Sequence, residues 1–114
     1  MTEETALDAA HAAMQAAPED DAARLRFFER IADAELFVLL EAEPEGDQIR
    51  PVLTEDYVLV FDRAARLATH AGGSAPYVAL SGRAIAGMLE GQPLGLAINM
   101  GVAPSETLLD AKAL

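Results

Sequence analysis

The chain of 114 residues contains no cysteine and no tryptophan, and only 5% of its residues are aromatic. Without cysteine, disulfide bridges, zinc–thiolate sites, iron–sulfur clusters and cysteine nucleophiles are all excluded. The apolar run at residues 36–40 falls far short of the roughly 20 helical residues that cross a bilayer, so the sequence predicts no membrane span. Basic residues are also scarce: eight lysines and arginines stand against 19 acidic residues, for a formal net charge of -11.

The excess negative charge lies in the first half of the sequence. Residues 1–57 hold 15 acidic and 4 basic residues, a net charge of 4 − 15 = -11, whereas residues 58–114 hold four of each. Proteins that bind nucleic acid use basic residues to neutralise phosphates, and anionic lipid surfaces attract basic segments. The charge therefore predicts no nucleic-acid partner and no membrane partner, and it favours a partner protein with a basic surface.

The hydrophobic pattern predicts an α+β domain. Helices are predicted over residues 3–17, 21–32, 62–70 and 82–90, and from residue 104 onward, about five in all. In the second helix, Leu25, Phe28 and either Ile31 or Ala32 are expected to face inward. Asp62 is expected to cap the third helix. Strands are predicted over residues 35–42, 48–54, 57–61, 77–80 and 94–99. The first three strands have connections too short for parallel crossovers, so we expect an antiparallel meander within a five-stranded mixed sheet.

We expect a single domain over residues 1–114, because the length suits one domain and no linker divides the chain. The last predicted helix begins at Pro104 and meets no terminating residue before Leu114, so we expect the natural domain to continue beyond this point. The first residues lack the basic and apolar regions of a secretory signal, and the lack of cysteine fits a reducing compartment. We therefore expect a cytoplasmic protein.

Four acidic residues follow the first predicted strand at alternate positions: Glu41, Glu43, Glu45 and Asp47. Gly46 stands where the calcium loop of an EF-hand has its glycine, but Val52 stands where that loop needs a bidentate glutamate. We therefore predict that these acids bind no calcium. They are expected to form a solvated loop tip, and this acidic surface would face the basic partner.

The motifs of catalysis are missing from the sequence. The serine-containing segments 73–75 and 80–82 do not match the G-x-S-x-G motif, and no Walker-type loop precedes the only lysine, Lys112. The spacing of His11 and His70 gives no reason to place them together in a metal or catalytic site. We expect a non-catalytic protein without metal or cofactor.

A second candidate site lies where two predicted strands end. Ser81 is expected to cap the helix that follows it, and Arg83 is one of four cations in the neutral half. Asn99 and Gly101 follow the last predicted strand, in a turn whose left-handed conformations both residues tolerate. If these residues share one edge of the sheet, they form a site for an anionic small molecule or a weak enzyme. Self-association through a strand edge or through the alanine-rich first helix is a third alternative.

Several segments resemble the N-terminal domain of the SseB-like proteins. The similar segments are FERIADA (28–34), LFVLL (36–40), PVL (51–53), LVFD (59–62), LSGR (80–83) and LAINMGVAPS (96–105). The resemblance implies an α+β bacterial domain, and it transfers no catalytic residue. The family takes its name from enhanced serine sensitivity in enteric bacteria, and its molecular activity is not established. Together with the charge, the resemblance leads us to expect a bacterial interaction or regulatory domain.

Overall fold

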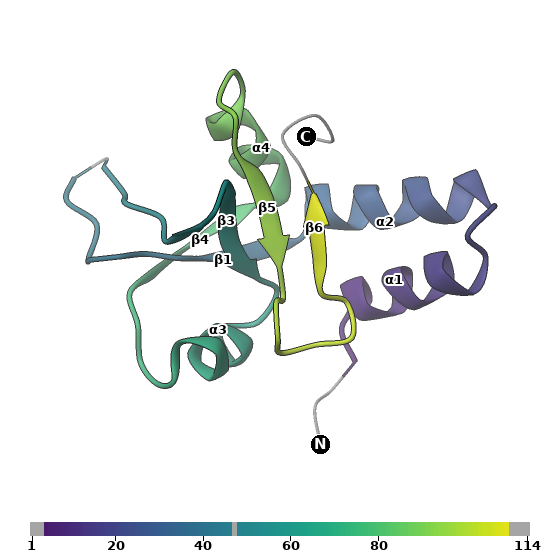
Figure 1. Cartoon of the computed structure of the whole chain (residues 1–114), viewed down its shortest axis with the longest axis horizontal. Helices are drawn as coiled ribbons and strands as arrows, with labels where there is room; N and C mark the ends of the chain where they lie inside the picture. Colours follow the sequence, from purple (N-terminus) through teal and green to yellow (C-terminus); the bar gives the residue numbers. More distant parts are fainter. Residues whose placement is uncertain (1–3, 47, 110–114) are drawn as a thin grey trace.

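The computed structural model describes residues 4–46 and 48–109, and Figure 1 shows its arrangement. Within these residues the chain forms four helices: α1 (Ala6–Ala16), α2 (Asp21–Asp33), α3 (Ala64–Ala71) and α4 (Gly82–Leu89). It also forms six strands: β1 (Glu35–Leu39), β2 (Leu53–Thr54), β3 (Tyr57–Phe61), β4 (Tyr77–Ser81), β5 (Gly95–Ile98) and β6 (Thr107–Leu109). The predicted α+β class is confirmed, with one helix fewer and one strand more than expected.

The strands form one mixed sheet in the order β4–β1–β3–β5–β6, and β2 pairs with β3 beside this path. β1 is antiparallel to both β4 and β3, whereas β3 and β5 are parallel. The carboxyl ends of β3, β4 and β5 therefore lie at the same edge of the sheet, next to the amino end of β1. We call this the carboxyl edge.

The predicted antiparallel meander is only partly correct, because β1 pairs directly with β3. The segment that connects β1 to β3 forms hydrogen bonds with both strands only near one end of the pair. There the Val52 N–H donates to the Leu39 carbonyl (2.9 Å), and the Val52 carbonyl accepts from the Leu59 N–H (3.4 Å). Pro51 has no N–H to donate to a ladder, so the strand predicted over residues 48–54 shortens to β2.

The helix predicted from Pro104 is wrong within the described residues. The chain turns back after β5, where Asn99 and Gly101 adopt positive φ angles of 53° and 76°. β6 then pairs antiparallel with β5, with Thr107 opposite Ile98. A strand of three residues is too short to show the alternation by which strands are predicted from sequence. The rest of that predicted helix, residues 110–114, lies outside the described residues.

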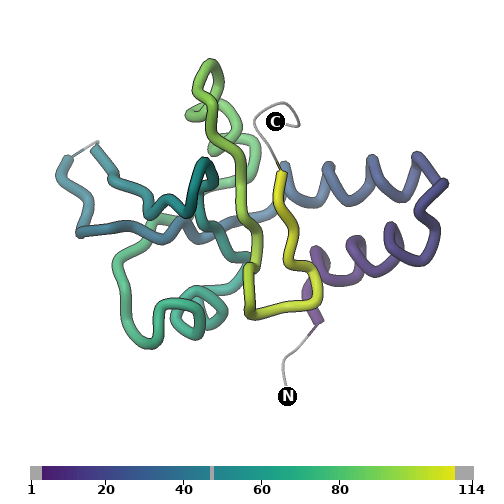
Figure 2. Tube along the Cα trace, viewed as in Figure 1, coloured from purple at the N-terminus to yellow at the C-terminus, as the bar shows by residue number. Residues whose placement is uncertain are grey.

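Helices cover the two faces of the sheet unequally. The larger core cluster joins one face to α1, α2 and α4 through Leu7, Phe27, Ile31, Leu36, Val38, Leu40, Val58, Val60, Ile85, Leu89, Leu96, Ile98 and Leu109. The smaller cluster joins the other face to α3 through Leu39, Leu59, Phe61, Leu67 and Ala97. Figure 2 shows α1 and α2 as an antiparallel pair that extends to one side of the sheet.

The predicted inward face of α2 is correct at Ile31, which is buried, and wrong at Leu25. Leu25 is 61% exposed, and Phe28 is only half-buried. The buried stripe consists of Ala23, Phe27 and Ile31, which recur every four residues. Packing against both α1 and the sheet selects this stripe, and the sequence of α2 alone does not reveal it.

Gly82 allows α4 to approach α2 closely. A Cβ atom added at Gly82 would lie 1.9 Å from the carbonyl oxygen of Ile31. The Gly82→Ala variant is therefore expected to lose about 3 kcal/mol of unfolding free energy, because the backbone must shift. Gly87→Ala in the same helix is the matched control. Nothing lies within 4 Å of its added Cβ atom, and alanine favours a helix over glycine by about 1 kcal/mol. Urea denaturation measures both variants, and equal losses would contradict the close approach.

Candidate functional site

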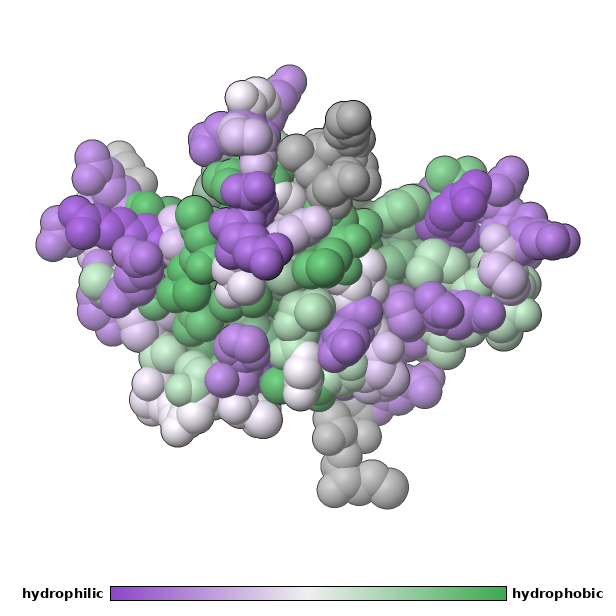
Figure 3. All heavy atoms as spheres, viewed as in Figure 1, coloured by the Kyte–Doolittle hydropathy of each residue, from purple (hydrophilic) through white to green (hydrophobic). Residues whose placement is uncertain are grey.

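The segment of residues 41–50 forms a projecting loop after β1. The Glu41 N–H donates to the Arg50 carbonyl (2.8 Å), and the backbones of Glu45 and Gln48 bond to each other in both directions (3.0 and 2.9 Å). Glu43 and the two other glutamates are exposed, and Figure 3 shows hydrophilic residues gathered over this end of the molecule. We call this loop, with its exposed side chains Glu41, Glu43 and Glu45, the acidic loop. Asp47, the fourth predicted acid, lies outside the described residues.

The second set of predicted site residues lies at the carboxyl edge. The Ser81 hydroxyl accepts a hydrogen bond from the Ala84 N–H (3.0 Å), which confirms that Ser81 caps α4. The Arg83 Nη2 donates to Asp33 Oδ1 (2.8 Å) at the surface, where both side chains are about two-thirds exposed. β1 and β3 lie between β4 and β5, so Ser81 and Asn99 stand three strand spacings apart, roughly 14 Å. The structure therefore places them on one edge but does not bring them into contact.

Asn99 is fully buried and holds together two chain segments at the carboxyl edge. Its Oδ1 accepts from the Asp62 N–H (3.1 Å), and its Nδ2 donates to the Ser105 hydroxyl (2.9 Å). The Gly101 N–H donates to the carboxylate of Glu106 (2.9 Å). These bonds fix the turn between β5 and β6.

A cluster of polar side chains continues from Asn99 into the interior. All of its members are buried: Thr5, Asp8, Asp62, Arg66, Asn99 and Ser105. We call them the buried polar cluster. They come from the start of α1, the end of β3, the first turns of α3, and the two ends of the β5–β6 connection.

Arg66 is the centre of the buried polar cluster. Its Nη1 donates to Asp8 Oδ1 (3.0 Å) and to Asp62 Oδ1 (2.8 Å). Its Nη2 donates to Asp8 Oδ2 (2.5 Å). One guanidinium thus binds two carboxylates from distant parts of the chain, because the planar group presents several donors in fixed directions.

Hydroxyl groups satisfy the remaining capacity of these carboxylates. The Ser105 hydroxyl donates to Asp8 Oδ1 (2.6 Å), and the Thr5 hydroxyl donates to Asp62 Oδ2 (2.5 Å). Thr5 and Asp8 also form a capping box at the start of α1, in which each backbone N–H donates to the side chain of the other residue (3.1 Å for both). The helix cap and the ion pairs are therefore parts of the same network.

The electrostatics of the cluster keep Asp8 ionised. Burial by itself raises the pKa of Asp8, because it disfavours the charged form. Hydrogen bonds from Arg66, Ser105 and the Thr5 backbone, together with the charge of Arg66, outweigh burial and hold the pKa well below its usual range. The hydrogen bond to Asp8 likewise raises the pKa of Arg66. A carboxylate so strongly acidic is a poor general base near neutral pH, so Asp8 is suited to a structural role.

Sequence reasoning missed most of the buried polar cluster, and it assigned Asp62 wrongly. Asp62 was expected to cap α3, but the N-cap residue is Arg63, whose side chain makes no capping bond. Two local signals were available: the Thr5–Asp8 spacing of a capping box and the i, i+4 spacing of Asp62 and Arg66. No local signal joins Asp8 to Ser105, which lies 97 residues away.

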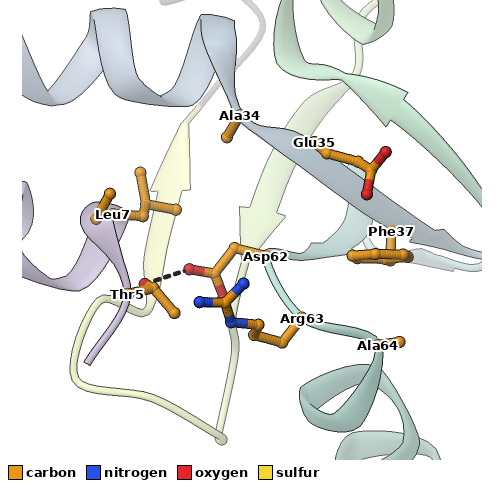
Figure 4. A pocket seen from close by; sticks show the side chains of 9 residues that line it. Thr5, Leu7, Ala34, Glu35, Phe37, Asp62, Arg63 and Ala64 are labelled. Carbon is orange, nitrogen blue, oxygen red and sulfur yellow. Dashed lines mark hydrogen bonds between the residues drawn. The ribbon is translucent and has the colours of Figure 1, made fainter. Parts of the chain in front are cut away.

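A pocket of about 280 Å³ opens beside the cluster at the carboxyl edge. Figure 4 shows Thr5 and Asp62 joined by their hydrogen bond, with Arg63 next to them and Phe37 on the β1 side. Glu35 also lines the pocket, so charges of both signs surround it. The carboxylate of Asp62 is already bound by Arg66 and Thr5, so the charges left for a ligand are those of Glu35 and Arg63. These two charges have opposite signs, and the pocket therefore favours neither an anion nor a cation.

A second pocket of about 200 Å³ lies between α2 and α4. Its lining is almost entirely apolar: Phe28, Ile31, Ala32, Gly82, Arg83, Ala86, Leu96 and Leu109. Arg83 is the one charged residue in this lining, and its side chain is largely exposed. The pocket therefore combines an apolar interior with a single cation.

Two further findings concern the described part of the chain. Among residues 4–46 and 48–109, no three histidine, aspartate or glutamate side chains come together in a way that would hold a metal ion. Over the same residues, no helix has both the length and the apolar composition needed to cross a membrane.

The architecture defines an α+β domain in which three helices cover one face of a mixed sheet and a single helix covers the other. The family model of the SseB protein N-terminal domain matches residues 7–113, which is nearly the whole chain. The chain therefore belongs to the SseB N-terminal domain family, and the resemblance noted from the sequence is confirmed. No curated protein and no solved structure matches the chain.

The low pKa of Asp8 makes the stability of the domain sensitive to acid. A group whose pKa is lowered by folding contributes stability above its unfolded value of about 3.9 and loses it as the pH falls toward the folded value. The Asp8→Asn variant is therefore expected to be less stable at pH 7 by about 3 kcal/mol, the low end for breaking a buried pair, because Arg66 retains Asp62.

The unfolding free energy of Asp8→Asn should also fall less than that of the wild type between about pH 5 and about pH 2. Asp33→Asn removes a carboxylate from an exposed pair and is expected to cost less than about 1 kcal/mol. Urea titrations at several pH values measure both variants. A parallel pH dependence in wild type and Asp8→Asn would disprove the role of Asp8.

Proposed function

We propose that this SseB N-terminal domain is a non-catalytic protein-interaction domain whose acidic loop binds a basic surface of a partner protein. The observation that carries the proposal is the exposure of Glu41, Glu43 and Glu45 on one projecting loop. Within the described residues, none of these three carboxylates forms an ion pair. Their charge is therefore available to a partner.

The backbone of the loop supports this function. The bond between Glu41 and Arg50 closes its base, and two backbone bonds join Glu45 to Gln48. A loop already held in shape loses less conformational entropy when a partner binds. Arg50 and the glutamates Glu43 and Glu45 line a hollow of about 80 Å³, so the loop presents one cation among its carboxylates.

The hydrogen bonds of the buried carboxylates support a structural role for these acids and not a catalytic one. Asp8 accepts bonds from Arg66 and Ser105, and Asp62 accepts bonds from Arg66 and Thr5. The exposed acids differ from them in having water as their neighbour. A field from exposed charges speeds association with an oppositely charged surface and weakens as salt is added.

The acidic loop is tested by neutralising it. The triple variant Glu41→Gln, Glu43→Gln, Glu45→Gln is expected to bind fluorescently labelled poly-lysine about tenfold more weakly at low salt, because three exposed ion pairs contribute roughly 0.5 kcal/mol each. The matched control is Glu19→Gln, Glu29→Gln, Glu90→Gln, which removes the same charge from three exposed positions elsewhere. Fluorescence anisotropy measures binding. Equal weakening in both triple variants would show that net charge, and not the loop, determines binding.

The apolar pocket beside Arg83 favours a second candidate function, the binding of a small carboxylate with a short apolar chain. The chain would enter the apolar interior, and its carboxylate would replace Asp33 as the partner of Arg83. This function uses one of the predicted edge residues, Arg83. It does not involve Ser81, which caps α4, or Asn99, which is buried in the cluster.

Thermal shift assays with butyrate, hexanoate and octanoate test the pocket. At saturation, one of these ligands is expected to raise the melting temperature by about 4 °C or more, because it binds only the folded state. The rise should disappear in Arg83→Met and persist in Asp33→Asn, which frees the guanidinium. The corresponding alcohols serve as controls without charge. The site is excluded if no chain length produces a shift, or if Arg83→Met keeps it.

A further inference from the structure

The strand β4 forms an outer edge of the sheet. It pairs with β1 on one side, and in the part of the chain that the structure describes no strand pairs with its other side. Its exposure alternates along its five residues: Tyr77, Ala79 and Ser81 are exposed, and Val78 and Leu80 are half-buried. β4 is therefore accessible along its whole length.

The hydrogen bonds at the two ends of β4 define which backbone groups are free. The Leu40 N–H donates to the Pro76 carbonyl (3.0 Å), and the Gly82 N–H donates to the Ala34 carbonyl (3.1 Å). Backbone groups alternate in direction along an antiparallel ladder, so the even-numbered residues of β4 point their N–H groups toward β1. The residues that point their N–H groups outward are Tyr77, Ala79 and Ser81.

β4 itself contains no charge, proline or bulge that would protect this edge, and the nearest proline, Pro76, directly precedes the strand. Natural edge strands are blunted by charged residues, proline, bulges or very short length. β4 contains no charged residue and no proline, and its register with β1 runs without interruption from the Glu35–Ser81 pair to the Leu39–Tyr77 pair. An unprotected edge of this kind is a template for another strand.

We propose that β4 pairs with β4 of a second copy of this chain, antiparallel about a two-fold axis at Ala79. The two sheets would then join into one. In this register Ala79 lies opposite itself in the second copy, and Tyr77 lies opposite Ser81. The register is chosen because it pairs all three outward-pointing residues and is symmetric, as a dimer interface of identical chains requires.

The distribution of charge argues for a second copy as the occupant. With a net charge of -11, two copies repel each other over most of their surface. β4 itself is uncharged, and the neighbouring Arg83 is already paired with Asp33 (2.8 Å). The nearest carboxylate along the β1 ladder, Glu35, lies one strand further in. Symmetric pairing of β4 therefore places no carboxylate opposite itself.

The side chains along the edge fit the same arrangement. Val78 and Leu80 pack against the larger core cluster and are only half-buried, so pairing would cover their exposed parts. On the opposite face, Tyr77 packs edge-to-face on Phe37, with ring centroids 5.3 Å apart. Tyr77 is thus held in position before a second strand arrives, which lowers the entropy lost on pairing.

Sedimentation equilibrium tests the dimer. The wild type is expected to be mainly dimeric at about 100 µM, and Ala79→Pro is expected to weaken the dimer at least tenfold. Proline removes an N–H that points away from β1, so the ladder inside the chain remains. Circular dichroism and the melting temperature report whether the variant is folded. Leu108→Ser, on the strand at the opposite edge of the sheet, is the control that leaves the dimer intact.

A charge pair at the axis tests the register. Ala79→Glu and Ala79→Lys are each expected to be monomeric, because each places like charges opposite each other. An equimolar mixture of the two is expected to form a heterodimer that dissociates as salt is added. A monomeric wild type at about 100 µM, an Ala79→Pro variant that stays dimeric, or a mixture that stays monomeric would each overturn the proposal. The triple variant of the acidic loop should remain dimeric, so the two proposals fail independently.

Discussion

The structure depends on the contacts of Arg66 with Asp8 and Asp62. Of α1, Leu7 and Asp8 are buried, and Ala10 and Met14 are partly buried against the larger core cluster. Arg66 adds charge-assisted hydrogen bonds to its first turn, at a point where Thr5 already caps the helix. Burying charged groups costs several kcal/mol for each ion, and the bonds offset this cost because every carboxylate oxygen has a donor. The buried polar cluster therefore serves more to fix the position of α1 in the fold than to raise the net free energy of unfolding.

The same cluster determines which parts of the carboxyl edge are open to other molecules. In open α/β sheets, ligands commonly bind beyond the carboxyl ends of the strands. Here Asp62 follows β3 and Asn99 follows β5, and both are occupied with interior bonds. Two cations remain exposed at this edge, Arg63 and Arg83, and they belong to the starts of helices α3 and α4. The binding functions that we propose therefore lie at the periphery: the pocket at Arg83, the acidic loop and the edge of β4.

The features that depend on neighbouring residues in the chain were predicted correctly from the sequence. The capping serine at Ser81, the helices α1 and α2, and the strands β1 and β3 follow from side-chain chemistry and spacing that neighbouring residues share. The errors arose where distant contacts decide the outcome. Leu25 does not face inward, because packing against α1 and the sheet buries another stripe of α2. Asp62 does not cap α3, because its carboxylate accepts bonds from Arg66 and Thr5. The residues proposed for the β4 edge were predicted as a strand, but their place at the border of the sheet follows only from the pairing of β1.

The parallel pairing of β3 with β5 has a consequence for how the domain assembles. Tyr57 lies opposite Gly95, and the chain between them contains α3, β4 and α4. Contacts over such long stretches form slowly, because the entropy of loop closure is lost before the contacts are gained. The bond between Asp8 and Ser105 joins still more distant residues and requires the β5–β6 turn to exist. We therefore expect the first turn of α1 to gain its contact with Ser105 late in folding, after the β5–β6 turn has formed.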